Sequence, residues 1–227
     1  MKRTMLVTVA LAAALAAGCN RDHNTTTTGS ASGDASAVGT SGKVPAGDRD
    51  FVKDVTTMNE AELNVARTAA ERAADPNTKK FAQMVIDDHT AAGDKLKTVA
   101  SQNSIDVPVP DNDKVQDEQK KLADKNGLDF DKAYADLMVD DHQKLVDKLE
   151  SRIDRKTLSE FKQYQTDHAN GQREKTEAKA VAVVPEKSDN AVTTAINQWA
   201  ADTYPVAYAH LQAAKDMRDG LKKRSTD

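Results

Sequence analysis

The chain has 227 residues, of which 38% are hydrophobic, 4% aromatic and 30% charged, and its formal net charge is −4. Acidic and basic residues are interspersed without a basic stripe, which excludes a nucleic-acid partner because such proteins need a positively charged face. The single cysteine excludes an internal disulfide.

The first 18 residues have the pattern of a signal peptide. Two basic residues are followed by an apolar run, residues 5–17, and small residues precede Cys19. The run is too short for a membrane span. Small residues before a cysteine resemble a bacterial lipobox, in which the cysteine is lipidated and becomes the mature N-terminus, although Ala16 replaces the usual leucine. We expect an exported protein anchored through Cys19, with plain secretion after cleavage near Gly18 as the alternative.

Residues 19–47 are predicted to form a disordered tether. They are rich in Thr, Ser, Gly and Ala and contain almost no large apolar residue, so they cannot bury a core. Asn20, rather than an aspartate, follows the cysteine, which favours the outer membrane by analogy with lipoprotein sorting. The predicted location is therefore the periplasmic side of the envelope, with the lipid in the outer membrane.

Residues 48–227 are predicted to form one helical domain, because their apolar residues recur at helical spacing. Asp75 and Pro76 predict a capped turn, and Pro205 should interrupt the last helix. The first four predicted helices span residues 49–74, residues from 76 to a point before 108, residues 114–125 and about 130–153. A capping box from Thr157 to Glu160 predicts a fifth helix from residue 157 to about 180, and the last helix spans residues 190–218.

These helices predict an all-α four-helix bundle. Residues 104–128 form a crossover connection, as some four-helix bundles have. An extra polar helix is inserted before the last bundle helix, within about residues 155–187, and it is expected to project from the bundle.

Four of the predicted helices each place one potential metal ligand on an apolar face: Glu62, His89, His142 and His210. Glu62 and His89 lie at equal distances from the Asp75 turn, so they should have the same depth. His142 is near mid-helix, and His210 follows Pro205 closely. We therefore predict that the four side chains converge in one layer.

A carboxylate and three imidazoles are costly to bury unless they bond something. One hypothesis is a transition metal ion such as zinc, copper or iron, because these ions accept imidazole and carboxylate ligands. The alternative is a hydrogen-bonded polar layer without a metal, in which Glu62 accepts from imidazole N–H groups.

A short repeat relates two of the histidines. Residues 86–96 are echoed by residues 139–149, so that Asp88 precedes one histidine and Asp141 the other. Both aspartates point away from the predicted core. They could orient imidazoles, but we expect solvated surface residues.

Several stretches together resemble a known family. They are Glu62, residues 81–85 leading to His89, residues 130–134 leading to His142, and Tyr204-Pro205 leading to His210. They resemble the exported bacterial ferritin-like proteins grouped as domain of unknown function number 4142, often labelled outer membrane proteins. The resemblance implies a ferritin-like bundle in which the four polar residues are the candidate site, and it implies no established activity. The Glu-x-x-His pairs of di-iron centres are missing, so ferroxidase chemistry is not supported.

Function is narrowed to two main hypotheses. The first is a lipid-anchored envelope protein that binds a transition metal for storage, buffering or stress protection. The alternative is a non-enzymatic envelope interaction or structural module, whose Glu/His layer fixes helix register and whose inserted helix contacts an envelope protein. An enzyme ranks last, because the sequence has no phosphate-binding loop, no nucleophile elbow and no cysteine thiol beyond Cys19.

Overall fold

The structure, a computed structural model, describes residues 43–107, 109–169 and 181–224. Over these ranges all regular secondary structure is helical, which confirms the predicted fold class. The predicted signal peptide, Cys19 and most of the predicted tether lie outside the described residues. The helices are α1 (Ala46–Arg72), α2 (Pro76–Gln102), α3 (Asn112–Ala123), α4 (Gly127–Glu150), α5 (Arg155–Ala169) and α6 (Ala191–Lys223).

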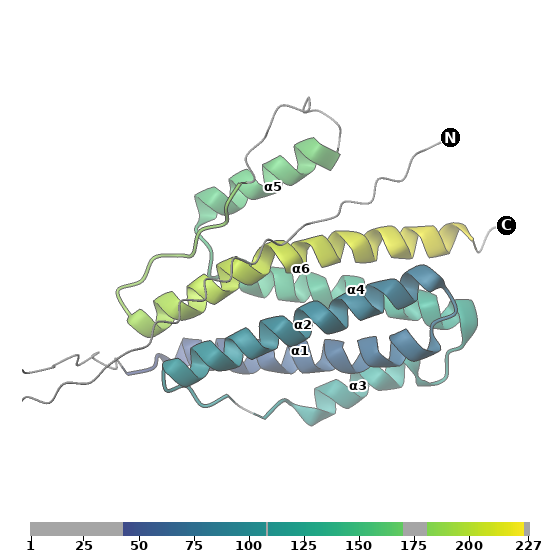
Figure 1. The fold of residues 1–227 in the computed structure, drawn as a ribbon, viewed down its shortest axis with the longest axis horizontal. Coiled ribbons are helices and arrows are strands. Elements are labelled where there is room, and N and C mark those ends of the chain that lie inside the picture. Colours follow the sequence, from purple (N-terminus) through teal and green to yellow (C-terminus); the bar gives the residue numbers. More distant parts are fainter. Residues whose placement is uncertain (1–42, 108, 170–180, 225–227) are drawn as a thin grey trace, which may run out of the picture. The chain divides into compact units, whose positions relative to one another are not determined.

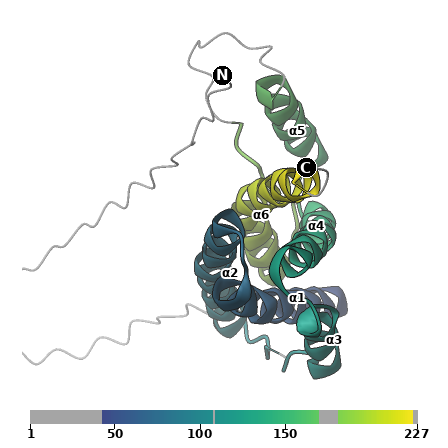
Figure 2. The same cartoon turned by 90° about the vertical axis from the view of Figure 1, so that its right-hand side faces the viewer.

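The long helices α1, α2, α4 and α6 form the bundle (Figure 1). Viewed roughly along the helices, they surround a common centre in the order α1, α2, α6, α4 (Figure 2). Arg72 at the end of α1 donates to carbonyl oxygens just before α4, and Arg152 just after α4 donates to Asp48 at the start of α1. Since α1 is thus antiparallel to both α4 and α2, helices α2 and α4 run in the same direction.

The connection between α2 and α4 therefore returns along the length of the bundle. It contains α3, which packs on the outside of α1 and α4 (Figure 2). Asp111 caps α3, and Gly127 begins α4 with a φ of 54°, a backbone conformation that suits glycine. The ferritin-like assignment of this topology stays an implication of the family resemblance.

The turn between α1 and α2 fixes the depth of both helices. Asp75 caps α2 by accepting hydrogen bonds from the backbone N–H groups of Asn77 and Thr78, at 2.7 and 3.2 Å, and Pro76 is the first helical residue. Asp131 on α4 accepts two further hydrogen bonds from backbone N–H groups of the turn. The prediction of a capped turn is confirmed.

The predicted interruption of the last helix at Pro205 is wrong. Helix α6 continues through this residue and past Gly220. A proline inside a helix removes one backbone hydrogen bond, but the stretch packs against α2 and α4, and its neighbours Tyr204 and Ala207 are buried. Tertiary packing therefore offsets the local cost.

The inserted helix α5 begins at Arg155, earlier than the predicted capping box. Its cap is Asp154, whose carboxylate accepts the N–H of Thr157 at 2.9 Å. The helix lies apart from the bundle in Figure 1 and contacts α6 through the ring of Phe161, whose centroid is 5.5 Å from that of Tyr204. The predicted extension to residue 180 lies outside the described residues.

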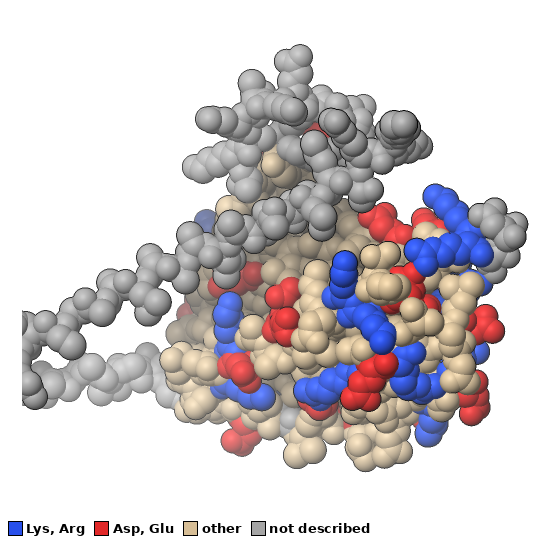
Figure 3. Space-filling model, turned by 45° about the vertical axis from the view of Figure 1, so that its right-hand side comes forward, with Lys and Arg blue, Asp and Glu red and all other residues tan. Residues whose placement is uncertain are grey.

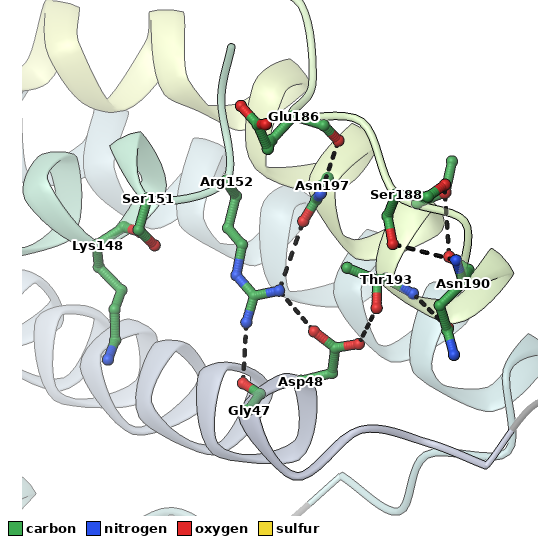
Figure 4. Close-up of polar contacts among 11 residues, drawn as sticks. Gly47, Asp48, Lys148, Ser151, Arg152, Glu186, Ser188, Asn190, Thr193 and Asn197 are labelled. Atoms are coloured by element: carbon green, nitrogen blue, oxygen red, sulfur yellow. Dashed lines mark hydrogen bonds and ion pairs between the residues drawn. The ribbon is translucent and has the colours of Figure 1, made fainter. Parts of the chain in front are cut away.

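Arg152 ties three helices together at one end of the bundle (Figure 4). Its guanidinium donates to the carboxylate of Asp48 at 2.5 Å and to the carbonyl oxygen of Gly47 at 2.9 Å, and it lies 4.5 Å from the centroid of the Phe51 ring. Asp48 also accepts a hydrogen bond from the hydroxyl of Thr193 on α6, at 2.6 Å. One arginine thus links the start of α1, the end of α4 and the start of α6.

The surface carries both charge signs. On the face drawn in Figure 3, Lys and Arg side chains are mixed with Asp and Glu. Within the described ranges, none of the helices combines the length and the apolar character that a membrane crossing requires.

Candidate metal site

The four predicted ligands meet in the centre of the bundle. Glu62 on α1, His89 on α2, His142 on α4 and His210 on α6 are all buried. The centroids of the three imidazole rings are 5.3, 5.4 and 5.6 Å apart, and one nitrogen of each ring lies within 4.8 Å of the others. The structure thus brings the four side chains together, and their role as metal ligands stays a prediction.

Hydrogen bonds fix the proton positions on two of the rings. His142 Nδ1 is 3.0 Å from the carbonyl oxygen of Met138, and His210 Nε2 is 2.9 Å from the carboxylate of Asp88 on α2. Because a carbonyl or carboxylate oxygen can only accept, these nitrogens carry the protons. In the neutral rings the lone pairs therefore lie on Nε2 of His142 and Nδ1 of His210.

These two lone-pair nitrogens face each other at 3.3 Å. Such an arrangement needs a proton or a metal ion between the nitrogens. Burial lowers the pKa of both His142 and His210, so an additional proton is disfavoured. Two nitrogens bound to one tetrahedral Zn²⁺ at about 2.0–2.1 Å lie about 3.3 Å apart. The pair therefore has the spacing of two ligands of one ion.

His89 is the third imidazole. Its Nε2 is 3.5 Å from Glu62 Oε2, and its Nδ1 has no hydrogen-bond partner among the described residues. The ring is nearly parallel to that of His210, with an interplanar angle of 11°, so a shared ion requires His89 to rotate about its Cβ–Cγ bond. Burial lowers the pKa of His89 to about 3, which keeps the ring neutral and able to bind a metal at neutral pH.

Glu62 lies beside the imidazoles rather than between them. Its Oε2 is 3.4 Å from His142 Nδ1, the nitrogen that is turned away from His210. Neither carboxyl oxygen finds a hydrogen-bond partner in the described part of the chain. Burial raises the pKa of Glu62 well above its ordinary value, and the neighbouring Asp141 and Glu118 add to this effect. A nearby cation would reverse that preference and stabilise the ionised form.

Aromatic side chains close one side of the layer. The Phe81 ring centroid lies 6.1 Å from that of His142 and 6.3 Å from that of His210. Tyr134, two turns before His142 on α4, is also buried, and its hydroxyl has no hydrogen-bond partner among the residues described. Burial, followed by the charge of Glu62, raises the pKa of Tyr134. Tyr134 thus adds a buried polar atom without a partner near Glu62.

The two aspartates of the sequence repeat differ in the structure. Asp88 has a side chain that is 47% exposed, but it bonds His210 and not the adjacent His89. Asp141 is buried, and its carboxylate accepts a hydrogen bond from Lys144 at 2.9 Å. The expectation of a solvated residue is therefore wrong for Asp141, and Asp88 combines partial exposure with a specific contact.

The three neutral imidazoles should make stability depend on pH. A histidine in the unfolded chain takes up a proton near pH 6.5, whereas burial lowers the pKa of His89 to about 3 and also lowers those of His142 and His210. Between these values the unfolded state binds more protons, so the free energy of unfolding should fall as the pH drops below about 6.5, by up to about 1.4 kcal/mol per unit for each histidine. Glu62 has the opposite effect on stability above pH 4.5. Because its pKa is raised, the folded state holds the proton that the unfolded chain has released, so this residue makes the free energy of unfolding rise as the pH falls.

Urea denaturation in the presence of a chelator at pH 7.5, 6.0 and 5.0 would measure this slope. The slope should shrink in His89→Gln, which keeps a polar group but cannot be protonated in this range. Equal stability of the parent protein at all three pH values would contradict the prediction.

Fold and site together define an all-α bundle with a histidine cluster buried at its centre. The chain belongs to the family described as a domain of unknown function (DUF4142), which matches residues 33–177. This match includes α1 to α4, with Glu62, His89 and His142, whereas His210 lies beyond it. No curated protein and no solved structure matches the chain.

Proposed function

We propose that this protein is an exported, lipid-anchored envelope protein whose bundle binds one transition metal ion through His89, His142 and His210. The observation that carries the proposal is the pair of imidazole lone pairs on His142 and His210, which face each other at 3.3 Å in a buried layer. Glu62 is the adjacent anion that offsets the charge of the ion.

The donor set suits a borderline ion. Three imidazole nitrogens and one nearby carboxylate are typical of zinc and also suit copper or iron. The proton positions support this assignment, because metal-binding imidazoles usually donate their other N–H to a carbonyl or carboxylate, as His142 and His210 do. We assign the bound ion to storage, buffering or stress protection rather than to catalysis.

Direct metal analysis tests the proposal. The full chain, purified without a tag or chelator, should contain close to one equivalent of zinc, copper or iron, and a His89→Ala/His142→Ala double variant should contain none. A parent protein that is empty and does not take up added Zn²⁺, Cu²⁺ or Fe²⁺ would overturn the proposal and leave a hydrogen-bonded structural layer.

Asp88 should support metal binding without contacting the ion. Replacing it with asparagine should lower the affinity for Co²⁺ about 10–100-fold. The reason is that a neutral amide oxygen accepts a weaker hydrogen bond from the N–H of His210 than a carboxylate does. Absorption titration of Co²⁺ would measure the change. The matched control is Asp87→Asn, since Asp87 bonds Gln83 on the helix surface and not an imidazole. Equal Co²⁺ affinity in Asp88→Asn and the parent would contradict the prediction.

The anchor is a separate part of the proposal and rests on the sequence pattern at Cys19. Full-length protein expressed in a bacterium should fractionate with the outer membrane, and Cys19→Ala should move it to the soluble periplasmic fraction. Membrane association that persists in Cys19→Ala would remove lipidation from the proposal.

The interaction module is the second candidate, and the position of α5 favours it. Helix α5 stands outside the four bundle helices, and its Phe161 packs on Tyr204 and Tyr208 of α6 (Figure 1). Charge-reversing substitutions at the exposed Lys156 and Glu160 should then abolish cross-linking to an envelope protein without changing metal content. Unchanged cross-linking would remove this candidate.

A further inference from the structure

A partly open hollow of about 730 Å³ lies between α1, α2 and the connection that leads from α2 to α3. Neither Glu62 nor any of the three histidines lines it, so it is separate from the imidazole layer. The apolar part of its wall comes from four segments of the chain and includes Val55 and Leu63, Leu96, Val107 and Trp199. Its volume and its mainly apolar wall are those of pockets that hold small organic ligands.

The apolar end of the hollow is at Trp199. The ring of Trp199 packs against Phe51, with ring centroids 6.3 Å apart, and its indole N–H donates to the carbonyl oxygen of Ala92 at 3.1 Å. Because Phe51 lies one turn before Val55 on α1, the tryptophan is at the Val55 end of the hollow. The indole N–H is the only polar group of this side chain and is already bonded, so this end suits an apolar chain.

The opposite end of the hollow carries a positive charge. Arg67 lines the hollow and lies about 18 Å beyond Val55 along α1, at 1.5 Å per residue. Among the described residues its guanidinium has no hydrogen-bond or ion-pair partner, whereas Lys97, which also lines the hollow, pairs with Asp94 at 3.3 Å. Glu60, between the two ends, disfavours an anion there. A ligand therefore meets an apolar wall at one end and an unpaired cation at the other.

A glycine keeps the hollow open on the side of α2. Gly93 lines it from the interior of this helix, where glycine is unfavourable relative to alanine. A Cβ atom at this position would lie 2.9 Å from Nδ2 of Asn59 on α1, which also lines the hollow. A larger side chain at residue 93 would therefore displace the amide of Asn59 and occupy the space of the hollow.

We propose that this hollow binds a free fatty acid, with the carboxylate at Arg67 and the alkyl chain along Leu63 and Leu96 toward Trp199. The guanidinium donates hydrogen bonds to a carboxylate, and the apolar wall removes the chain from water. The length of about 18 Å between Val55 and Arg67 fits an elongated ligand rather than a compact one. This site does not depend on the metal proposed for the imidazole layer.

Trp199 is the only tryptophan of the chain, so its fluorescence reports directly on this hollow. The probe is dibromostearate, whose bromine atoms lie near the middle of the alkyl chain and quench tryptophan on contact. Titrated into the full chain, it should quench Trp199 to a plateau. Gly93→Leu should abolish this quenching, because the new side chain fills the hollow. The matched control is Gly220→Leu, a helical glycine with open space around it and outside the hollow, which should keep the quenching.

A second pair of variants tests the charged end. Arg67→Gln should weaken the binding of dibromostearate about 2–5-fold, the usual contribution of a partly exposed ion pair, and should leave the binding of the corresponding alcohol unchanged. The matched control is Arg49→Gln on the same helix, because Arg49 donates to the carbonyl oxygen of Val44 and does not line the hollow.

The outcomes decide the proposal as follows. Circular dichroism would verify that each variant is folded. Absence of saturable quenching in the parent, or equal quenching in Gly93→Leu, would overturn the site. Equal affinity of Arg67→Gln and the parent for dibromostearate would overturn the carboxylate as the group that the site recognises.

Discussion

Replacing His142 with alanine should abolish the thermal stabilisation that Zn²⁺ gives to this protein. A ligand that binds only the folded state at about 1,000 times its Kd adds about 4 kcal/mol. For a domain of this size, each kcal/mol corresponds to about 2–4 °C, so Zn²⁺ should raise the Tm of the parent by about 10 °C. His142 is the right residue to remove, because its Nε2 faces Nδ1 of His210 at 3.3 Å and its ring centroid is 5.3 Å from that of His89.

The quantity to compare is the difference in Tm with and without Zn²⁺, measured by differential scanning calorimetry. This difference cancels the cost of the cavity that the alanine leaves, which would lower both melting temperatures. The matched control is His23→Ala, which removes an imidazole in the predicted tether and should keep the full Zn²⁺ effect. A Zn²⁺-induced rise in Tm that is the same in His142→Ala and the parent would exclude His142 as a ligand.

Helical periodicity was enough to bring the candidate site together. Each of the four residues has apolar neighbours three, four and seven positions away, which placed it on the inner face of its helix. The capped turn at Asp75 then set Glu62 and His89 at equal depth, and the structure has this turn. Local signals sufficed here because the site follows from helix register and from one short connection.

The partners of the site could not be predicted in the same way, because they come from packing between helices. The repeat pairs Asp88 with His89 in sequence, yet Asp88 bonds His210 across the α2–α6 contact. Asp141 on α4 is buried, and the helix packed against this part of the bundle from outside, α3, contacts both α1 and α4. A sequence signal for the burial of Glu118 was present, because the apolar Val115 and Leu122 lie three residues before it and four residues after it, on the same face of α3.

The continuity of α6 through Pro205 is a second feature that local sequence signals could not predict. Local chemistry favours a break at an internal proline. The helix nevertheless continues, since Tyr204 and Ala207 are held in the core on either side. His210 is therefore positioned by a single continuous helix, whose start is held at one end of the bundle by the network around Arg152.

Replacing Arg152 with alanine should lower the free energy of unfolding by about 3–5 kcal/mol, the usual cost of leaving one member of a buried ion pair without its partner. Asp48 is only 2% exposed. Without Arg152, its carboxylate would keep only the hydrogen bond that it accepts from the hydroxyl of Thr193. The substitution also removes the hydrogen bond to Gly47 and the contact with the Phe51 ring (Figure 4). Urea denaturation would measure the loss.

Two variants make this test specific. Lys148→Ala, one turn earlier on the same helix, breaks a partly exposed pair with Asp54 and should cost at most about 1 kcal/mol. Arg152→Lys keeps the positive charge but cannot reproduce the forked set of hydrogen bonds, so it should recover only part of the loss. If Arg152→Ala cost no more than Lys148→Ala, the network would not hold α1, α4 and α6 together. Because α6 carries His210, the same variant should also weaken Co²⁺ binding if the start of this helix sets the position of the imidazole.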